Sequence, residues 1–325
     1  MKLGLFVNSQ YVYGESMAKK IQESVEQVRV AREAGFGLIA AGQHFMAEPF
    51  QMSSLFPLLA RLAAEAGDMQ VAATVILVPL HNPVELAESI ATLDCITGGR
   101  FVFGVGLGYR DEEYAAFGIR RNERVGRLEE SVDIIKKLWT EDEVEYHGKY
   151  YTVPRITPTT KPEQKPHPPI WVAANNDGAI KRAARWGCPW LVNPHATVPM
   201  IANQWVHYKS ALEAAGNPVP HDLPMMRELY IARDREMAYI ESQPYLEPKY
   251  AAYASWGQDK ALPGEESFRI PYQDLAKDRF LLGSPDDVVA ELKRYSSELG
   301  VNQMLFRMQW PGMPQAQVLE QIELL

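Results

Sequence analysis

The sequence predicts an α/β protein, a (β/α)8 TIM barrel with excursions after the fourth and seventh strands. The first observation is that apolar runs of strand length alternate with helical patterns along the chain. The second is the count, because eight such runs occur within 325 residues, which we expect to form one domain over residues 1–325. The third is that the run at 71–78 is continuously apolar, as in a parallel strand covered on both faces. A doubly wound sheet is the alternative.

Residues 71–108 form the clearest strand–helix–strand unit. The runs at 71–78 and 101–105 are rich in Val, Ile and Phe. Between them, Asn82 is suited to cap a helix, and Glu85 stands at the capping-box position. A strand, a crossover helix and a parallel strand make one right-handed unit, and the rest of the chain reads as variations on it.

The six other predicted strands complete the count of eight. They lie at residues 3–7, 38–41, 170–173, 189–192, 225–232 and 303–308.

Helices are predicted where apolar residues recur with helical spacing and where capping residues mark the ends. They lie at residues 16–35, 53–62, 125–139, 198–215, 284–300 and 315–325, and one more begins at 175–178.

Four segments depart from the alternation. Residues 109–123 read as a polar loop, and residues 143–153 alternate around His-Gly as in a β-hairpin. Residues 154–169 are proline-rich and predict an extended connector. Residues 234–282 lack a clean period, and we expect a partly helical excursion there.

Composition excludes several classes of protein. The net charge of −8 disfavours nucleic acid and anionic membranes as partners, because both favour basic surfaces. No apolar run approaches the length of a membrane span. Two cysteines do not make a disulfide framework, so a cytoplasmic location is expected.

Functional groups in a barrel gather where its strands end, so the residues at these positions are the first candidates. Asn8 follows the first strand and His44 follows the second. Thr74 and Val75 lie within the third strand. Gly106, Leu107 and Gly108 close the fourth strand, and residues 174–179, with sequence ANNDGA, follow the fifth.

The glycines at 104–108 follow the pattern G-x-G-x-G, which is not the dinucleotide-binding fingerprint. Tyr109 stands where a third glycine would be needed, and Arg124 stands where an acidic ribose-binding residue is expected. A twisted strand end and a backbone approached closely by a flat ligand explain the glycines equally well.

Residues 174–179 offer helix N-terminal N–H groups and asparagine amides, which suit a phosphate. Simple helix capping is the commoner explanation for such a segment. Arg124 and Arg127 begin the preceding long helix, where the helix dipole disfavours cations. An anionic partner explains them, as does an ion-paired surface.

His44 is either a polar structural residue or a functional group at the barrel mouth. The histidines show no metal-ligand spacing, so no metal is expected, and no G-x-S-x-G nucleophile motif is present. The chemistry is therefore expected to belong to an organic cofactor.

Several longer segments carry a family resemblance. VPLHNPVELAESIATLDCITGGRFVFGVGLG, followed by AFG, RxxRLEE, PPIWVAANNDGAIKRAARWG and LLGSPDDVVAEL, resembles the bacterial luciferase-like flavin-dependent monooxygenases. This resemblance implies a (β/α)8 barrel that binds reduced FMN, or in one branch a deazaflavin, at its mouth.

The resemblance also implies roles for individual residues. Thr74-Val75 matches a non-proline cis peptide under the flavin ring, and His44 matches a histidine on the reactive side of that ring. The implied catalytic residue is His44, and the implied cofactor-binding residues are Asn8, Thr74, Val75, Gly106, Leu107, Gly108, Arg124, Ala174, Asn175, Asn176, Gly178 and Ala179.

The implied activity is oxygenation of a small organic substrate by reduced FMN and O2, with a separate NAD(P)H:flavin reductase. The alternatives are deazaflavin-dependent hydride transfer and flavin binding without turnover. A homodimer is expected through the helices with apolar stripes at 55–62 and 86–93, although each stripe could face the chain's own barrel. The expected cavity wall and lid comprise Tyr11, Tyr13, Phe45, Tyr109 and the 234–282 excursion.

Overall fold

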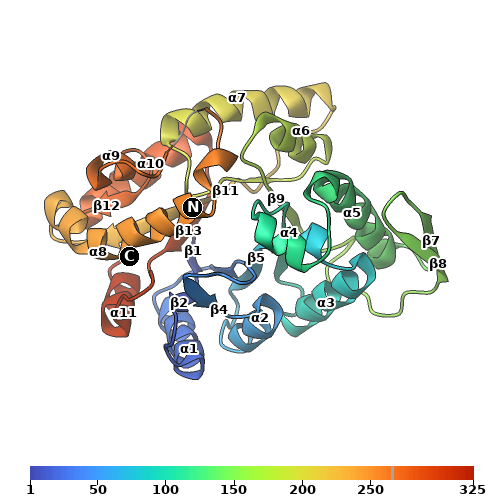
Figure 1. The fold of residues 1–325 in the computed structure, drawn as a ribbon, viewed down its shortest axis with the longest axis horizontal. Coiled ribbons are helices and arrows are strands. Elements are labelled where there is room, and N and C mark those ends of the chain that lie inside the picture. The colour runs from blue at the N-terminus through green and yellow to red at the C-terminus, as the bar shows by residue number, and fades with distance from the viewer. Residues whose placement is uncertain (265–266) are drawn as a thin grey trace.

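The computed structural model describes residues 1–264 and 267–325, so Glu265 and Glu266 of the predicted excursion lie outside the described residues. The central element is a curled parallel sheet in the order β10-β9-β6-β5-β3-β1-β13-β11-β12 (Figure 1). Its strands are β1 Lys2–Phe6, β3 Leu38–Ala41, β5 Gln70–Leu77, β6 Phe101–Gly106, β9 Ile170–Ala173, β10 Trp190–Leu191, β11 Pro224–Ile231, β12 Leu281–Gly283 and β13 Gln303–Arg307.

The sheet curls back toward itself at its two ends. The main-chain N–H of Val192, next to β10, donates to Pro224 O at 3.0 Å, and the N–H of Met226 donates to Val192 O at 3.0 Å. This pairing is parallel, as are the other pairings along the sheet. The predicted α/β class with parallel strands is confirmed. Strand β12 was not predicted, and it pairs with the C-terminal part of β11.

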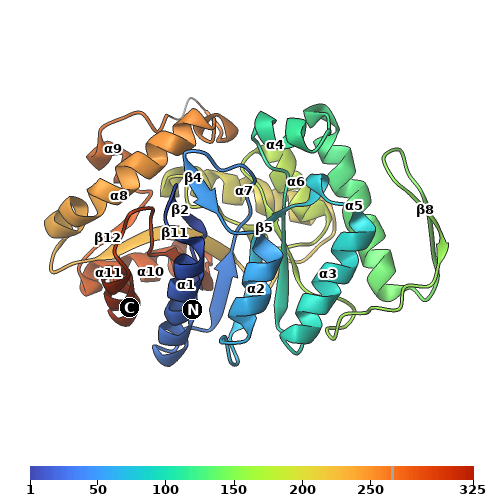
Figure 2. The same ribbon diagram turned by 60° about the horizontal axis from the view of Figure 1, so that its bottom comes forward.

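Helices cover the outside of the curled sheet, and Figure 2 shows α1, α2 and α3 side by side on one flank. Asn82 caps α3 by accepting the Val84 N–H at 2.9 Å, as predicted. Glu85 accepts a bond from Ser89 instead of completing a capping box. The covering helices are α1 Met17–Glu33, α2 Leu55–Ala63, α3 Pro83–Ile96, α5 Arg124–Thr140, α6 Asp177–Arg185, α7 Val198–Ala214, α10 Pro285–Leu299 and α11 Gln315–Glu323.

The apolar stripes of α2 and α3 face the chain's own sheet. The side chains of Leu58 and Leu62 in α2, and of Leu86 and Ile90 in α3, are buried within this single chain. Of the two alternatives for these stripes, packing against the barrel is therefore the correct one.

A separate apolar cluster fills the inside of the sheet. Its members point inward from the strands, and Trp171 is its largest fully buried side chain. Side chains of Phe6, Leu191 and Met226 from this cluster also line the cavity above it, so the cluster forms the cavity's floor.

The first excursion follows β6. The predicted polar loop at 109–123 is partly wrong, because it contains helix α4 (Asp111–Ala116) and the 3-10 helix η2 (Arg121–Glu123). The predicted hairpin is confirmed as β7 (Val144–His147) paired antiparallel with β8 (Thr152–Ile156), beside α5.

The second excursion follows β11 and is more helical than its sequence predicts. Helix α8 (Arg235–Ser255) runs through Pro244 and Pro248, and it is followed by η3 (Asp259–Ala261) and α9 (Tyr272–Ala276). Each proline removes a helical N–H donor and interrupts the periodic pattern. Burial of one face of α8, including Leu246 and Tyr250, maintains the helix across them.

A small antiparallel pair, β2 (Gln10–Val12) with β4 (Phe50–Met52), lies at the carboxyl ends of the parallel strands.

Candidate functional site

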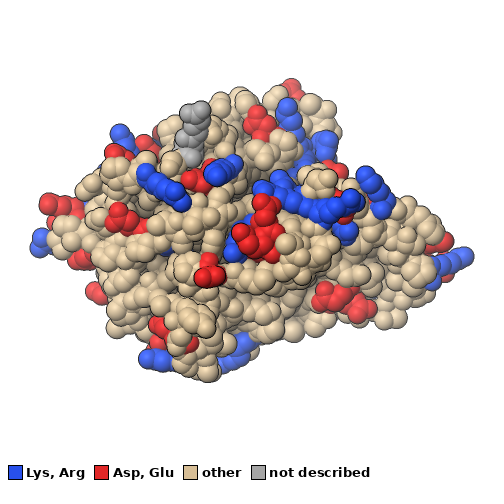
Figure 3. All heavy atoms as spheres, in the orientation of Figure 1, with Lys and Arg blue, Asp and Glu red and all other residues tan. Residues whose placement is uncertain are grey.

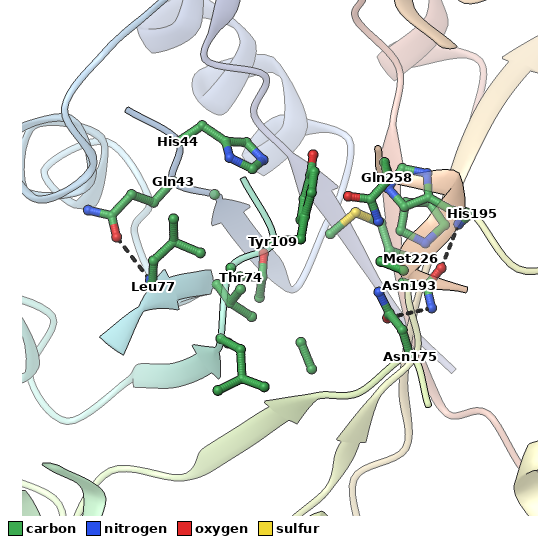
Figure 4. Close-up of a pocket in the computed structure, with 18 of the residues that line it drawn as sticks. Gln43, His44, Thr74, Leu77, Tyr109, Asn175, Asn193, His195, Met226 and Gln258 are labelled. Atoms are coloured by element: carbon green, nitrogen blue, oxygen red, sulfur yellow. Dashed lines mark hydrogen bonds between the residues drawn. The ribbon is translucent and has the colours of Figure 1, made fainter. Parts of the chain in front are cut away.

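A cavity of about 390 Å³ opens at the carboxyl ends of the strands (Figure 4). His44 and Gln43 lie on one side, and Asn175, Asn193, His195 and Gln258 lie on the other. The structure brings together most of the residues predicted from sequence. Those that line the cavity are Asn8, His44, Thr74, Val75, Gly106, Leu107, Gly108, Arg124, Asn175, Asn176 and Ala179.

Two predicted cofactor-binding residues do not line the cavity. Ala174 is buried, and its carbonyl oxygen accepts the Trp190 Nε1–H at 2.9 Å. Gly178 lies in the first turn of α6, behind Asn176. These two residues therefore support the cavity-lining residues of their segment.

The cavity's central wall is the end of β5. The Thr74–Val75 peptide bond is cis, as the family resemblance implies. The Thr74 hydroxyl is buried and has no hydrogen-bond partner among the described residues. An unsatisfied hydroxyl of this kind is suited to a polar group of a bound ligand.

The glycines at 104–108 allow close packing against β5. A Cβ on Gly104 would stand 2.0 Å from Ala73 O, and one on Gly106 would stand 2.5 Å from Val75 Cγ2. Gly108, after the end of β6, has a φ of +79°, which favours glycine. Gly106 and Gly108 also line the cavity, and the approach of a flat ligand to their backbone stays a prediction.

One end of the cavity carries donors suited to an anion. Arg124 begins α5, and its Nε is buried without a hydrogen-bond partner in the described part of the chain. Arg121 also lines this end and pairs with Asp111 at 2.8 Å. Asn175 Oδ1 accepts a bond from Asn193 Nδ2, so the amide nitrogen of Asn175 is its remaining side-chain donor. Guanidinium and amide N–H groups together match the acceptor oxygens of a phosphate.

Helix α6 begins at the same end. Asn176 Oδ1 accepts the Ala179 N–H at 3.1 Å, so helix capping is confirmed for Asn176. Arg182, one turn further, is buried, and burial together with the charges of Arg185 and Arg124 lowers the pKa of its guanidinium. Figure 3 shows basic side chains gathered over α5 and α6. This concentration of positive charge favours an anionic ligand.

Arg127 does not belong to this group. Its guanidinium pairs with Glu123 at 3.0 Å and lies over the rings of Tyr150 and Tyr151 in the hairpin. For Arg127, the ion-paired explanation is therefore correct.

His44 stands on the opposite side and contacts a buried carboxylate. Its Nδ1 lies 3.1 Å from Oε1 of Glu113, a residue of α4 that is fully buried. The same oxygen accepts the Phe45 N–H at 2.8 Å. When Glu113 is ionised it can only accept hydrogen bonds, and Nδ1 is then the donor, which leaves Nε2 for a ligand.

Helix α4 also fixes the loop that carries His44. Arg110 donates to Phe45 O at 2.8 Å and to Met46 O at 3.1 Å. Its guanidinium lies over the ring of Trp256, 4.4 Å from the centroid. The sequence analysis missed Glu113 because a polar six-residue helix has no apolar period, and the only signal was three acids at a helix start.

The aromatic wall is only partly as predicted. Tyr109 lines the cavity, and burial holds its pKa well above the usual range, so its hydroxyl remains neutral. The predicted wall residues Tyr11, Tyr13 and Phe45 are absent from the described lining. Tyr11 is buried against Asn8 and Ser24, whereas Tyr13 is 82% exposed.

Residues of the loop after β10, of the second excursion and of β13 complete the wall. The 234–282 excursion was expected to contribute to this wall, and Tyr253, Gln258 and Lys260 do so, whereas His195 and Arg307 were not predicted. Tyr253, His195 and Arg307 lie near the buried Glu228, which accepts bonds from Lys249 and Arg307. Burial alone would raise the pKa of Glu228, but these two cations hold it below its usual value.

Two other features do not occur in residues 1–264 and 267–325. No three His, Cys, Asp or Glu side chains are grouped so as to hold a metal ion. None of the helices combines the length and apolar composition needed to cross a bilayer.

Comparison with known proteins supplies a family. A family model described as luciferase-like monooxygenase matches residues 1–303. The flavin-dependent trigonelline monooxygenase, oxygenase component, of Acinetobacter baylyi is 25% identical over 312 residues, covering 91% of this chain and 86% of that protein. An F420-dependent glucose-6-phosphate dehydrogenase of Kineococcus radiotolerans is 27% identical over 304 residues, covering 90% and 88%.

The fold is also similar to that of a solved monooxygenase structure. The crystal structure of a monooxygenase from Streptomyces bottropensis superimposes with a TM-score of 0.88 and 25% identity, covering 100% of this chain and 97% of that one.

Proposed function

Because the chain belongs to the luciferase-like monooxygenase family, whose members are enzymes, we propose that it is an FMN-dependent monooxygenase. It would use reduced FMN and O2 to oxygenate a small organic substrate. The observation that carries this proposal is the anion-binding end of the cavity, where the buried Arg124 Nε lacks a partner among the described residues. A phosphate would satisfy that donor.

The residues present suit a flavin phosphate and ring. Arg124, Arg121 and the amide of Asn175 would hold the phosphate. Thr74, Val75 and the backbone of Gly106–Gly108 would contact the ring system. When bound, reduced flavin supplies the electrons that activate oxygen.

His44 would hold or deliver a proton beside the reacting atoms. Glu113 keeps hydrogen on Nδ1 and stabilises the doubly protonated ring when Nε2 takes up a proton. The neutral Tyr109 and Trp256 lie against the His44 ring, with centroids 5.6 Å away, and they limit the access of water. These residues therefore combine proton handling with a dry wall.

A separate NAD(P)H:flavin reductase is part of the proposal, supported by a relative named as an oxygenase component. A cytoplasmic location would supply the reduced nicotinamide. We also propose that residues 1–325 form one barrel domain, in which the Val192–Met225 bridge closes the sheet and the two excursions follow β6 and β11. A homodimer remains proposed on the family resemblance alone.

The second candidate is deazaflavin-dependent hydride transfer, as in the F420-dependent relatives. That coenzyme has an anionic tail, which an acidic cavity wall would repel. Among the described residues that line the cavity there is no Asp or Glu. The charge of the cavity wall therefore gives no reason to exclude the deazaflavin.

Titration of the full chain with reduced FMN and with the reduced deazaflavin distinguishes the two candidates. We expect FMN to bind at least about tenfold more tightly, equivalent to about 1.4 kcal/mol. Tighter binding of the deazaflavin would favour hydride transfer. Oxygen consumption with a substrate-dependent product would exclude flavin binding without turnover.

A further inference from the structure

The lining of the cavity is strongly biased in charge. Four of its described residues, Arg121, Arg124, Lys260 and Arg307, are cationic, and the described part of the lining contains no Asp or Glu. The whole chain has the opposite sign, −8. A cavity with this bias selects anionic ligands, and the phosphate assigned above accounts for only Arg121 and Arg124.

Arg307 is the deepest of the four cations. Its guanidinium lies over the ring of Phe6, 4.3 Å from the centroid, and Phe6 belongs to the cavity's floor. Arg307 Nη1 donates to Glu228 Oε1 at 3.2 Å and to the Tyr253 hydroxyl at 3.3 Å. These bonds engage one end of the planar guanidinium, and Nε is buried without a hydrogen-bond partner among the described residues. The group is therefore fixed in place with donor capacity left.

The carboxylate beside Arg307 is shared. Glu228 Oε1 also accepts a bond from Lys249 Nζ at 2.5 Å, and Oε2 accepts the Trp310 Nε1–H at 2.6 Å. Two buried cations therefore share one buried carboxylate. Burial and the charge of Arg307 hold the pKa of Lys249 well below its usual value. One more negative charge next to Arg307 would balance the group.

Gln10 supplies a neutral donor near Arg307, since both residues bond the hydroxyl of Tyr253. Gln10 lines the cavity, and its Oε1 accepts the Tyr253 hydroxyl at 3.0 Å, so its amide nitrogen is the group left for a ligand. A guanidinium and an amide N–H next to each other match the two oxygens of a carboxylate.

This corner is separate from the phosphate end. Arg307 ends β13, whereas Arg124 follows β6, and strands β5, β3 and β1 lie between those two in the sheet. An anion at Arg307 is therefore a second anionic group in the cavity.

Building on the proposed function, we propose that Arg307 and Gln10 bind a carboxylate of the organic substrate, so that the enzyme acts on small carboxylic acids. The positive charge of Arg307, at the floor of the cavity and away from the flavin phosphate, thus selects the substrate.

Calorimetric titration of the full chain with benzoate and with benzamide, with and without FMN, tests this assignment. The two probes have similar shape and differ in charge. We expect wild-type protein to bind benzoate at least about tenfold more tightly than benzamide, since a charge-assisted bond is stronger than a neutral one. In R307Q this ratio should fall to near one, and in R124A it should persist.

Equal affinities in wild-type protein, or a ratio that survives in R307Q, would overturn the proposal. Loss of the ratio in R124A alone would place benzoate in the phosphate site and overturn it as well. Should R307Q not fold, R307K retains the charge without the planar fork, and its ratio should fall between wild type and one; an unchanged ratio would contradict the assignment. FMN affinity is measured in the same titrations, so failure of the flavin proposal is seen separately.

Discussion

A histidine bonded to a buried carboxylate can carry a proton on one ring nitrogen and present the other to a ligand. His44 and Glu113 form such a pair, although 69 positions separate them in the sequence. The pair depends on α4, which holds the carboxylate and fixes the loop that carries the histidine.

Replacement of His44 by Ala should leave FMN binding within a few-fold but reduce coupled turnover by about 100-fold or more, because a proton donor is lost. Oxygen uptake should continue and yield hydrogen peroxide. E113Q should show a smaller loss in the same direction, about tenfold, since it keeps the shape but not the charge.

The measurement is product formed against hydrogen peroxide, with any substrate that the wild-type protein oxygenates. E112Q, at an exposed position of the same helix, is the matched control and should behave as wild type. Wild-type coupling in H44A would show that His44 only lines the cavity.

Arg124 is expected to bind the phosphate of FMN. R124A should weaken FMN binding by about 1.5–3 kcal/mol, or roughly 10- to 150-fold, and should barely change riboflavin binding. Fluorescence titration with both flavins measures the difference. R127A, whose guanidinium pairs with Glu123 and does not belong to the anion-binding group, serves as control. Equal losses for both flavins would remove Arg124 from the phosphate site.

His195 should make stability depend on pH. Burial, and then the charges of Arg307 and Lys249, hold its pKa well below its ordinary value near 6.5. Below pH 6.5 the unfolded chain therefore binds a proton that the folded chain does not, and stability falls as the pH falls. The loss from this residue grows as the pH falls further below 6.5.

Urea unfolding at pH 7.5 and 5.5 measures this loss, and H195N should reduce the difference between the two pH values. The other histidines with lowered pKa, His81 and His167, remain in both proteins and cancel in the comparison. An equal pH dependence in both proteins would contradict the prediction.

At the scale of elements, strands and long amphipathic helices could be predicted because their residues repeat with a fixed period. The short helix α4 and the proline-containing helix α8 could not, since tertiary contacts stabilise them. The candidate site divides in the same way. Its strand-end residues, such as His44 and Asn175, were identifiable by position, whereas Glu113 and Arg307 become relevant only through partners distant in sequence.

The packing of β5 against β6 depends on Gly104. G104A would place a methyl group 2.0 Å from Ala73 O, so a backbone shift is required. We expect a loss of about 1–3 kcal/mol and a lower Tm. G178A, whose methyl group would meet only Asn176 Oδ1 at 3.5 Å, should leave the Tm unchanged or slightly raised. Thermal unfolding of both variants measures this, and equal Tm values would refute the packing argument.

At the scale of the whole molecule, light scattering tests the proposed homodimer, and we expect twice the mass of the 36.7 kDa chain at micromolar concentration. Because the stripes of α2 and α3 are buried within the chain, any dimer must use other surfaces of the chain. A monomer at that concentration would rule the dimer out.

The pairing of β1 with β13 has a consequence for synthesis on the ribosome. Lys2 and Gln303 are partners in this parallel pair. The side-chain amide of Gln27 in α1 also donates hydrogen bonds to the side chains of Gln309 and Gln315. The ribosome adds about 5–20 residues per second, so roughly 15–60 s pass between the synthesis of β1 and that of β13. During that interval one edge of the nascent strand is open to pairing with other chains, so a chaperone that covers it should increase the yield of folded protein.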